Sequence, residues 1–262
     1  MRQPVITLTT DFGLSDHYVG VMKGVILTIA PHARIVDITH ELPPYEPAQA
    51  AYIVEQTYRW FPKKTIHVAV VDPGVGSSRR PILMEAAGQY FIGPDNGIFT
   101  LVSQRERHKV RAITNHKVFL KEVSQTFHGR DVFAPAAAHL AKGVAPARFG
   151  SPIQDALRLN MPKPPRTGKR TWSGTILKVD RFGNLVTNFH MDDFGEHMQR
   201  PFEMAVGLEK IGKLATHYAA CAPGELFLIV GSSGYLEVST NSGSASKRLG
   251  CGVGAPAELS VY

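Results

Sequence analysis

The sequence predicts an α/β protein with two domains: an N-terminal domain with a doubly wound, mostly parallel sheet, and a small C-terminal antiparallel β-barrel domain. Two observations carry this prediction. From residue 4 to about residue 145, β-branched and other apolar runs alternate with helical patterns, which is typical of βαβ units. Beyond residue 170 the chain changes to short apolar runs punctuated by glycine, which indicates an antiparallel sheet or barrel.

The N-terminal strands are expected at residues 4–12, 33–40 and 65–74. These runs are apolar and rich in β-branched residues, and they lie between helical patterns. Such runs are typical of parallel strands that are covered by helices on both faces.

Two helices are expected between these strands, at residues 16–30 and 46–61. In the first, one face is formed by residues spaced four, three and four apart, Tyr18, Met22, Val25 and Ile29, as in an amphipathic helix. Asp16 is its expected N-cap, and Pro47 is expected in the first turn of the second helix.

The segment LNMPKPPRTGKR, residues 159–170, separates the two patterns because it holds three prolines within four positions. It is predicted to be a linker, and we place the domains at residues 1–164 and 165–262. The strands expected after the linker lie in four segments, residues 171–189, 202–208, 226–241 and 255–262.

Composition excludes several classes of protein. The 262 residues are 44% hydrophobic, enough to bury a core. No apolar run approaches the roughly 18 residues of a membrane span, and the chain enters a strand pattern without the regions of a secretory signal. The sequence therefore predicts a cytoplasmic protein with no membrane partner.

Cysteine spacing and the distribution of charge exclude further kinds of site and partner. Cys221 and Cys251 have no companion ligands at metal spacing, so neither a disulfide framework nor a metal site is indicated, and both are expected to be core residues. The formal net charge is +7, but the basic residues are scattered except for PKPPRTGKR at 162–170. No nucleic-acid partner is expected.

Titratable residues lie at the carboxyl ends of several predicted strands. They are Asp11 in the first, His40 and Glu41 at the end of the second, Asp72 in the third, and Asp95 in the run YFIGPDNG. Each one alone is compatible with a turn or a cap. Ligands of open α/β sheets, however, bind beyond the carboxyl ends of the strands, and this shared edge favours Asp11 and Asp72 as site residues.

The loop VVDPGVGSSRRP, residues 70–81, brings an arginine back toward Asp72. Gly74 and Gly76 are expected to allow a tight turn and close approach to a ligand, so that Arg79 returns to the carboxylate. The loop has neither the ending of a P-loop nor the spacing of a dinucleotide site.

A histidine precedes a third helical pattern. Residues 130–140 of TFHGRDVFAPAAAHL are expected to be helical, and His128 and Gly129 lie just before this helix, in an exposed position. An aromatic before the histidine and a glycine after it suit a pocket wall. The residues alone therefore predict an α/β enzyme with an Asp, Arg and His site and no metal.

Taken together, TTDFG, VVDPGVGSSRR, GPDNG, FHGRDVF, DRFGNLVTN and SSGYLEV closely resemble the S-adenosyl-L-methionine (SAM) hydrolases, also called SAM hydroxide adenosyltransferases, which are related to fluorinase and chlorinase. The resemblance extends over nearly the whole chain. It implies attack of water or hydroxide on C5′ of SAM, giving adenosine and L-methionine. SAM is then the substrate and no cofactor is needed, and the implied assembly is a homotrimer with active sites between subunits.

The resemblance also assigns residues. Asp72, Arg79 and His128 would be catalytic, with Arg79 preferred to Arg80 because the family spacing is seven. Asp11 would bind the ribose hydroxyls, which suits a carboxylate that accepts two hydrogen bonds. The remaining substrate-binding residues are expected to be Asp16, Asp180, Phe182, Asn184, Ser232, Ser233, Tyr235, Asn241 and Ser242, with Asp72 also touching substrate.

Two positions depart from the halogenases, which carry an aromatic at Asp72 and a serine at Gly129. A carboxylate at this place would repel halide and favour a water that donates to it. The alternatives are a halide adenosyltransferase and a non-catalytic sensor of SAM or adenosine, which would need no catalytic trio.

The proton acceptor stays open between two residues. His128 has the better-matched reference pKa, about 6.5, whereas an aspartate such as Asp72 starts at about 3.9. Arg79 would orient the aspartate and stabilise developing negative charge.

Overall fold

The computed structural model describes residues 3–161 and 163–262 and divides them into two compact units, residues 1–159 and 160–262. Pro162, one of the prolines of the predicted linker, lies outside the described residues. No helix in the described part of the chain is long and apolar enough to cross a membrane.

The first unit is a seven-stranded sheet in the order β2-β1-β3-β5-β4-β6-β7. Strands β2, β1, β3 and β5 run parallel, whereas β4 is antiparallel to both β5 and β6, and β6 is antiparallel to β7. The strands are β1 (Val5–Thr10), β2 (Arg34–Thr39), β3 (Ile66–Val70), β4 (Pro81–Ala86), β5 (Gln89–Pro94), β6 (His108–Ala112) and β7 (Pro152–Ile153).

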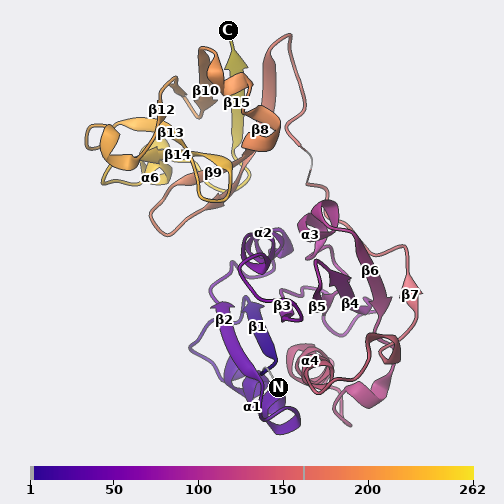
Figure 1. Cartoon of the computed structure of the whole chain (residues 1–262). Helices are drawn as coiled ribbons and strands as arrows, with labels where there is room; N and C mark the ends of the chain where they lie inside the picture. Colours follow the sequence, from indigo (N-terminus) through magenta and orange to yellow (C-terminus); the bar gives the residue numbers. More distant parts are fainter. Residues whose placement is uncertain (1–2, 162) are drawn as a thin grey trace. The chain divides into compact units, whose positions relative to one another are not determined.

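Helices cover both faces of this sheet (Figure 1). They are α1 (Tyr18–Ile29), α2 (Pro47–Tyr58), α3 (Thr100–Arg105) and α4 (Ala134–Ala141), and α4 follows a π-helical turn at Gly129–Phe133. Helices α1 and α4 share one core cluster with β1 and β3, and α2 and α3 share another with β4 and β5. The predicted α/β class with helices on both faces is confirmed, although strands β4, β6 and β7 and helix α3 were not predicted.

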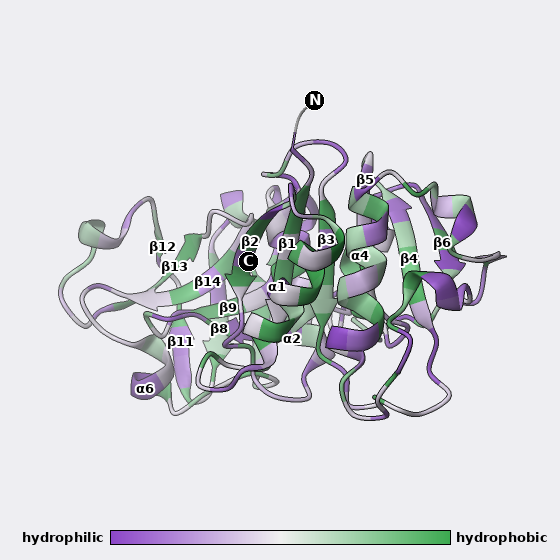
Figure 2. Ribbon diagram, turned by 90° about the horizontal axis from the view of Figure 1, so that it is seen from below, coloured by the Kyte–Doolittle hydropathy of each residue, from purple (hydrophilic) through white to green (hydrophobic). Residues whose placement is uncertain are grey.

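The strands that position the site are buried along their length. Every residue of β3 is buried, and in β1 only Val5 is partly exposed. Figure 2 shows β1 and β3 as hydrophobic strands inside the unit. Fully burying an aliphatic side chain contributes about 2 kcal/mol, so this central pair provides a stable support for the loops at its carboxyl ends.

Helix α1 differs from its prediction in two details. Its buried residues are Val19, Met22 and Ile26, whereas Tyr18 is 39% exposed and packs on aromatic rings near the sheet edge. Asp16 is not the N-cap, because His17 holds that position in a helical backbone conformation without a side-chain hydrogen bond. Pro47 does occupy the first turn of α2, as predicted.

The second unit is one eight-stranded sheet in the order β11-β10-β15-β8-β9-β14-β13-β12. It curls as a half-barrel and is antiparallel except for the β12–β13 pair, which confirms the predicted antiparallel fold. The strands are β8 (Thr171–Val179), β9 (Leu185–His190), β10 (Phe202–Val206), β11 (Glu209–Ile211), β12 (Leu214–Ala215), β13 (Leu226–Val230), β14 (Tyr235–Thr240) and β15 (Pro256–Val261), with short helices α5 (Met191–Phe194) and α6 (Ala245–Leu249).

Cys221 of this unit is buried and Cys251 is partly buried, and both are free thiols. Cys221 belongs to a small core cluster with Ala215, Phe227 and Ile229, as predicted, and Cys251 packs against the main core of the unit.

Candidate active site

Two aspartates meet where β1 and β3 end. The strands are parallel neighbours, with Thr10 paired to Val70, so Asp11 and Asp72 emerge from the same edge. Burial raises the pKa of the Asp11 carboxyl, and the charge of Asp72 raises it further, while the backbone N–H groups of Tyr45 and Asp11 itself act in the opposite direction. The shared edge expected from the strand pattern therefore brings two carboxylates into electrostatic contact.

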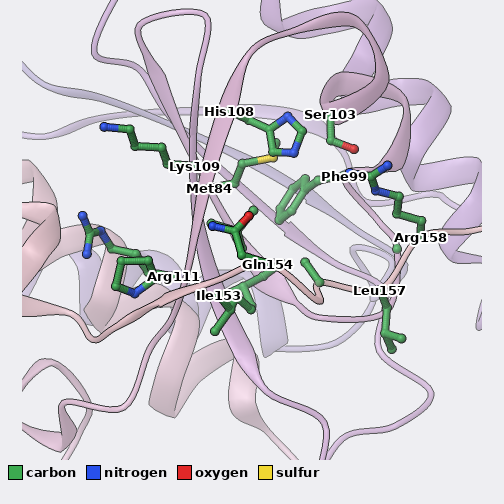
Figure 3. A pocket seen from close by; sticks show the side chains of 15 residues that line it. Met84, Phe99, Ser103, His108, Lys109, Arg111, Ile153, Gln154, Leu157 and Arg158 are labelled. Carbon is green, nitrogen blue, oxygen red and sulfur yellow. The ribbon is translucent and has the colours of Figure 1, made fainter.

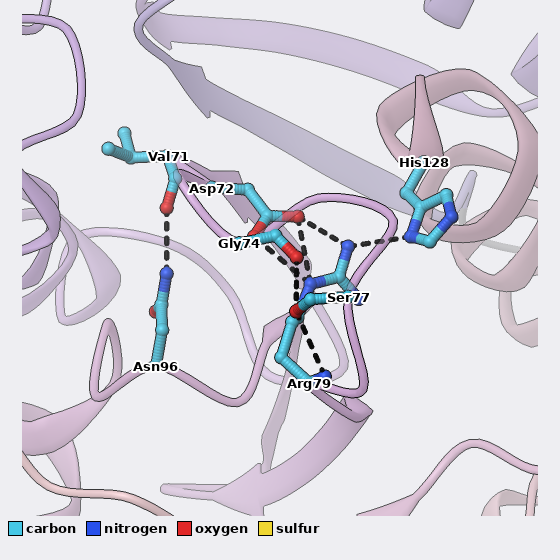
Figure 4. A network of polar contacts seen from close by, with 7 residues as sticks. All are labelled: Val71, Asp72, Gly74, Ser77, Arg79, Asn96 and His128. Atoms are coloured by element: carbon cyan, nitrogen blue, oxygen red, sulfur yellow. Dashed lines mark hydrogen bonds and ion pairs between the residues drawn. The ribbon is translucent and has the colours of Figure 1, made fainter. Parts of the chain in front are cut away.

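Arg79 returns to Asp72 through a bidentate ion pair (Figure 4). Its Nε lies 3.0 Å from Oδ1 and 2.9 Å from Oδ2 of Asp72, and its Nη2 also donates to Oδ2. The arginine side chain is 9% exposed and the aspartate side chain 5%. A buried pair of this geometry orients the carboxylate firmly. The guanidinium also lies over the Phe133 ring, 5.1 Å from its centroid.

His128 completes the trio from the other side of Arg79. Its Nδ1 lies 2.7 Å from Arg79 Nη2. Because an arginine nitrogen can only donate, Nδ1 is the acceptor and the proton of the neutral ring is on Nε2. Burial lowers the pKa of His128 and the Arg79 charge lowers it further, against weaker opposing effects of Asp72, Asp131 and the Ser124 backbone. The geometry thus selects a neutral imidazole of defined tautomer.

The loop between Asp72 and Arg79 is held by its own hydrogen bonds. Ser77 Oγ donates to the Gly74 carbonyl at 2.7 Å, and Val75 N donates to the Asp72 carbonyl at 3.2 Å. From outside the loop, Asn96 of the GPDNG turn donates from Nδ2 to the Val71 carbonyl at 2.8 Å. This turn, predicted from composition, therefore supports the strand end that carries Asp72.

Of the two loop glycines, only Gly76 has a left-handed backbone, with φ of +77°. A Cβ at this position would lie 2.3 Å from the Gln125 carbonyl oxygen, whereas one at Gly74 would meet only ordinary contacts at 3.4 Å or more. The expectation of unusual backbone conformation was therefore wrong for Gly74. Gly76 allows the loop between Asp72 and Arg79 to pack directly on the backbone of the segment that carries His128.

We expect Gly76→Ala to lower the free energy of unfolding by about 2 kcal/mol, because both the φ angle and the carbonyl contact oppose a methyl group. Turnover should fall as the loop shifts. Gly74→Ala is the matched control and should change stability by less than about 1 kcal/mol. Chemical denaturation of both variants measures this, and equal losses would contradict the assignment to Gly76.

A cavity of about 330 Å³ opens beside the trio. Polar side chains line one part of it and aromatic or aliphatic side chains the rest; the lining is Asp11, Phe12, Tyr18, Pro44, Tyr45, Val70, Asp72, Val75, Thr126, Phe127, His128 and Gly129. A mostly apolar pocket with a few directed polar groups is typical of small-molecule sites. Phe12, Tyr45 and Phe127 are functional candidates that the sequence did not reveal, because aromatic residues in loops carry no distinctive spacing.

Gly129 forms part of the wall and is buried, and His128 is only partly exposed, so the predicted exposed position of this pair was wrong. A Cβ on Gly129 would lie 3.1 to 3.2 Å from Phe127, Met22 and Phe12. A side chain at position 129 would therefore require these three neighbours in the cavity wall to shift.

Other titratable residues at strand ends have structural partners instead. Asp95 accepts from Arg80 Nε and Nη2 and from the Leu157 backbone, and Arg80 also pairs with Asp155. His40 lies between Thr10 and Asp37. Asp16 is exposed and is not in the cavity lining. The structure therefore separates Arg79 from its neighbour Arg80, as the spacing argument expects.

A second cavity of about 330 Å³ in the same unit holds none of the predicted residues (Figure 3). It lies among side chains of β4, β6 and residues 152–158, including Met84, His108 and Gln154. Its Arg111 already pairs with Glu85 and the Gly150 carbonyl. No trio of acid, base and cation is assembled there.

In the second unit, Asp180 organises the DRFGN turn between β8 and β9. Its Oδ1 accepts from the backbone N–H groups of Phe182 and Asn184, and its Oδ2 accepts from Asn184 Nδ2, all at 2.8 to 2.9 Å. Gly183 has φ of +86°, and Phe182 is 76% exposed. The turn therefore exposes the Phe182 ring, and hydrogen bonds within the turn use most of the accepting capacity of the Asp180 carboxylate.

The remaining predicted residues lie around β14. Ser232 and Ser233 form the turn before this strand, and Tyr235 begins it with its ring against His190. Asn241 follows it and donates from Nδ2 to the Cys221 carbonyl, while Ser242 donates to Asn241 Oδ1 and has φ of +57°. The two groups therefore lie at opposite ends of β14, and Asn241 and Ser242 already use part of their hydrogen-bonding capacity.

In the part of the chain that the structure describes, no group of three His, Cys, Asp or Glu side chains is arranged to hold a metal ion.

Comparison with known proteins places both units in one family. Residues 6–150 match the SAM hydroxide adenosyltransferase N-terminal domain and residues 174–258 match its C-terminal domain. A (R)-S-adenosyl-L-methionine hydrolase of Salinispora tropica is 36% identical over 252 residues, covering 94% of each chain. Three other relatives of the same name are 35 to 36% identical.

More distant relatives and a solved structure complete the comparison. A fluorinase of Actinoplanes is 28% identical over 91% of each chain. The crystal structure of an uncharacterized conserved protein from Thermotoga maritima superposes with a TM-score of 0.90 at 38% identity, covering 97% of this chain and 99% of that one.

Proposed function

The chain belongs to the SAM hydroxide adenosyltransferase family, and from this premise we propose that it hydrolyses S-adenosyl-L-methionine to adenosine and L-methionine by attack of water at C5′. The observation that carries the proposal is the contact of Arg79 with both Asp72 and His128, beside a cavity lined partly by aromatic residues. The four hydrolase relatives, which span nearly the full chain, support the same activity.

The chemical difficulty lies with the nucleophile, because the sulfonium is already a good leaving group. Lowering the pKa of water from 15.7 to near 7 would take roughly 12 kcal/mol, more than one arginine and one histidine supply. The water is therefore held in place and loses its proton during attack.

Geometry favours Asp72 over His128 as the proton acceptor. The only basic nitrogen of the neutral His128 ring, Nδ1, is occupied by Arg79 Nη2, and Nε2 carries a proton that can only be donated. The Asp72 oxygens receive three contacts from Arg79 and keep further lone pairs. His128 then holds Arg79, and Arg79 orients Asp72 and stabilises charge that develops during attack.

Asp11 is suited to the ribose. Its Oδ2 accepts from the Tyr45 backbone at 3.0 Å, which leaves Oδ1 for the sugar hydroxyls. A halide nucleophile is disfavoured by the same edge, because the carboxylates of Asp11 and Asp72 both face the cavity and would repel an anion.

A homotrimer with active sites between subunits is the proposed assembly, by resemblance to the family. Tyr45 of the cavity wall is 73% exposed and Leu14, two residues after the wall residue Phe12, is 66% exposed. A subunit contact would cover these large apolar side chains. Light scattering of the purified protein tests the trimer. The cytoplasmic location stays a prediction.

The activity is tested by incubating the protein with SAM in ¹⁸O-labelled water, with and without excess chloride, and analysing products by mass spectrometry. We expect ¹⁸O in the 5′-hydroxyl of adenosine, equimolar methionine and no effect of chloride. Chlorinated adenosine as the product would mean that the protein transfers halide to SAM instead of hydrolysing it. SAM that binds but is not converted would mean that the protein is a non-catalytic sensor.

A further inference from the structure

The concentrated run of basic residues in the sequence, PKPPRTGKR at 162–170, is not used by the proposed reaction. In the structure its second half folds back on β8 as a tight turn. Thr167 N donates to the Thr171 carbonyl at 2.9 Å, and Ser173 N donates to the Pro165 carbonyl at 3.0 Å. These backbone hydrogen bonds fix the positions from which the basic side chains of the turn extend.

This turn forms one side of a cavity of about 400 Å³ in the second unit. A separate segment, just before β10, contributes a further arginine and a histidine. The lining residues are Arg166, Arg170, Trp172, His197, Arg200 and Val261. Among the described residues that line the cavity, none is an aspartate or a glutamate. Two segments far apart in the sequence therefore converge to make an electropositive cavity.

The cationic groups of this cavity have no counter-charge in the described part of the chain. Arg170 and Arg200 are exposed and make neither an ion pair nor a side-chain hydrogen bond among residues 3–161 and 163–262. Arg166 likewise has no ion pair within these ranges. A cavity lined by charges of one sign concentrates the field and attracts a ligand of the opposite sign. An anion is therefore the ligand that this cavity favours.

Trp172 holds two of the cavity side chains in place. The Arg166 guanidinium lies over the indole, with its Cζ 5.7 Å from the ring centroid, and the centroid of the His197 ring lies 4.6 Å from that of the indole. Arg166 also donates from Nε to the Gly168 carbonyl at 3.0 Å and from Nη2 to the Lys169 carbonyl. Its Nη1 keeps two N–H groups for a ligand. Fixing the guanidinium beforehand lowers the entropic cost of binding.

Phosphate is the anion that best matches several guanidinium groups. Each guanidinium can direct two parallel N–H groups at phosphate oxygens, and three arginines around one cavity suit a ligand with more than one phosphate. Proteins that bind single-stranded nucleic acid combine a basic groove with exposed aromatic faces for the bases. Trp172 is only 9% exposed, so it offers no such face. A compact oligophosphate therefore fits better than a nucleic acid.

We propose that this cavity binds a small oligophosphate, either a free inorganic chain or the oligophosphate end of a nucleotide, through Arg166, Arg170 and Arg200. The inference goes beyond the proposed function and does not depend on it, because none of these arginines is assigned to SAM or to the reaction. Binding would neutralise the repulsion among the guanidinium groups and stabilise the folded protein.

Trp172 provides a reporter at the site itself. The chain contains two tryptophans, and Trp60 is 85% exposed, so Trp60→Phe leaves Trp172 as the single emitter with little effect on folding. The emission of the full-length protein is followed at about 0.15 M salt. The probes are inorganic tripolyphosphate, ATP, adenosine and an oligothymidylate of about 20 nucleotides. Thermal unfolding with and without tripolyphosphate gives an independent readout.

Arg170→Gln and Arg200→Gln, made in this background, test the cavity. Arg107→Gln is the matched control, because Arg107 is an exposed residue of the first unit and its loss changes the net charge equally. We expect tripolyphosphate to change the emission saturably and to raise Tm. Each cavity variant should weaken its binding about tenfold, and the double variant about 100-fold. Arg107→Gln should stay within about twofold of the parent.

The remaining probes distinguish the two sources of oligophosphate. Binding of ATP about as tightly as tripolyphosphate would identify the nucleotide form, and much weaker binding of ATP would identify the inorganic chain. Adenosine should leave the emission unchanged in both cases.

Four results would overturn the inference. The first is a parent protein in which tripolyphosphate changes neither the emission nor Tm. The second is equal weakening by Arg107→Gln, which would mean that net charge and not the cavity binds the anion. The third is an adenosine response equal to that of ATP, which would assign binding to the adenine. The fourth is a strongly salt-dependent preference for oligothymidylate, which would indicate a nucleic-acid surface instead.

Discussion

Arg79→Ala is expected to lower kcat about 10³-fold with little change in KM, which is the largest effect anticipated in this protein. Arg79 contacts both Asp72 and His128, so its removal disorders both at once. It also leaves the Asp72 carboxylate, only 5% exposed, without its cation. The free energy of unfolding should fall by about 3 kcal/mol for this reason. Steady-state production of adenosine and chemical denaturation measure the two effects.

Arg80→Ala is the internal control, because the neighbouring arginine has a different set of partners. Arg80 pairs with buried Asp95 and exposed Asp155, whereas Arg79 contacts Asp72 and His128. This variant should lose stability through Asp95 while keeping kcat within about threefold of wild type. If the two alanine variants lost kcat equally, catalysis would depend on the integrity of the loop and not on the guanidinium of Arg79.

The pairing of Asp72 with Arg79 was predictable from sequence because strand order and loop spacing bring the two residues together. Asp72 follows a buried parallel strand, and Arg79 lies seven positions later, far enough for a turn that reverses the chain. His128 could not be predicted from strand order and loop spacing, because nothing in the sequence between β6 and α4 indicates which loop passes the sheet edge. The family motif supplied that connection, and the 2.7 Å contact with Arg79 shows its geometric basis.

The details that were not predicted depend on three-dimensional contacts. Asp16 precedes a helix and has a capping side chain, yet the backbone of His17 is already helical and leaves no role for an Asp16 cap. Gly74 and Gly76 are equivalent in the sequence, but only Gly76 lies against a backbone carbonyl. Local pattern identifies such residues as candidates, and packing selects among them.

Glu237 illustrates the opposite failure. A single charged residue in GYLEVST resembles an ordinary solvent-facing position in an alternating strand. In the structure that face is buried as well, and burial, with the charge of Asp180, raises the pKa of the Glu237 carboxyl to about 7.

Two roles of His128, holding Arg79 and acting as a base, can be distinguished by comparing the substitutions His128→Asn and His128→Ala. An asparagine Oδ1 can take the place of the imidazole Nδ1 and accept from Arg79 Nη2, but an amide cannot act as a base at neutral pH. We expect His128→Asn to keep kcat within about tenfold of wild type, and His128→Ala to lose about 100-fold. Initial rates of adenosine formation, measured from pH 5 to pH 9, compare the two.

The pH dependence provides the second readout of the same comparison. Burial and Arg79 hold the pKa of His128 below its ordinary value, so the ring is neutral at neutral pH and gains a proton only as the pH falls through that lowered pKa. An imidazolium would direct an N–H at Arg79 and break the contact, so the wild-type rate should fall on the acid side. His128→Asn should lack this acid limb. If His128→Asn were as slow as His128→Ala, holding Arg79 would not be sufficient and the imidazole itself would have to carry the proton from water.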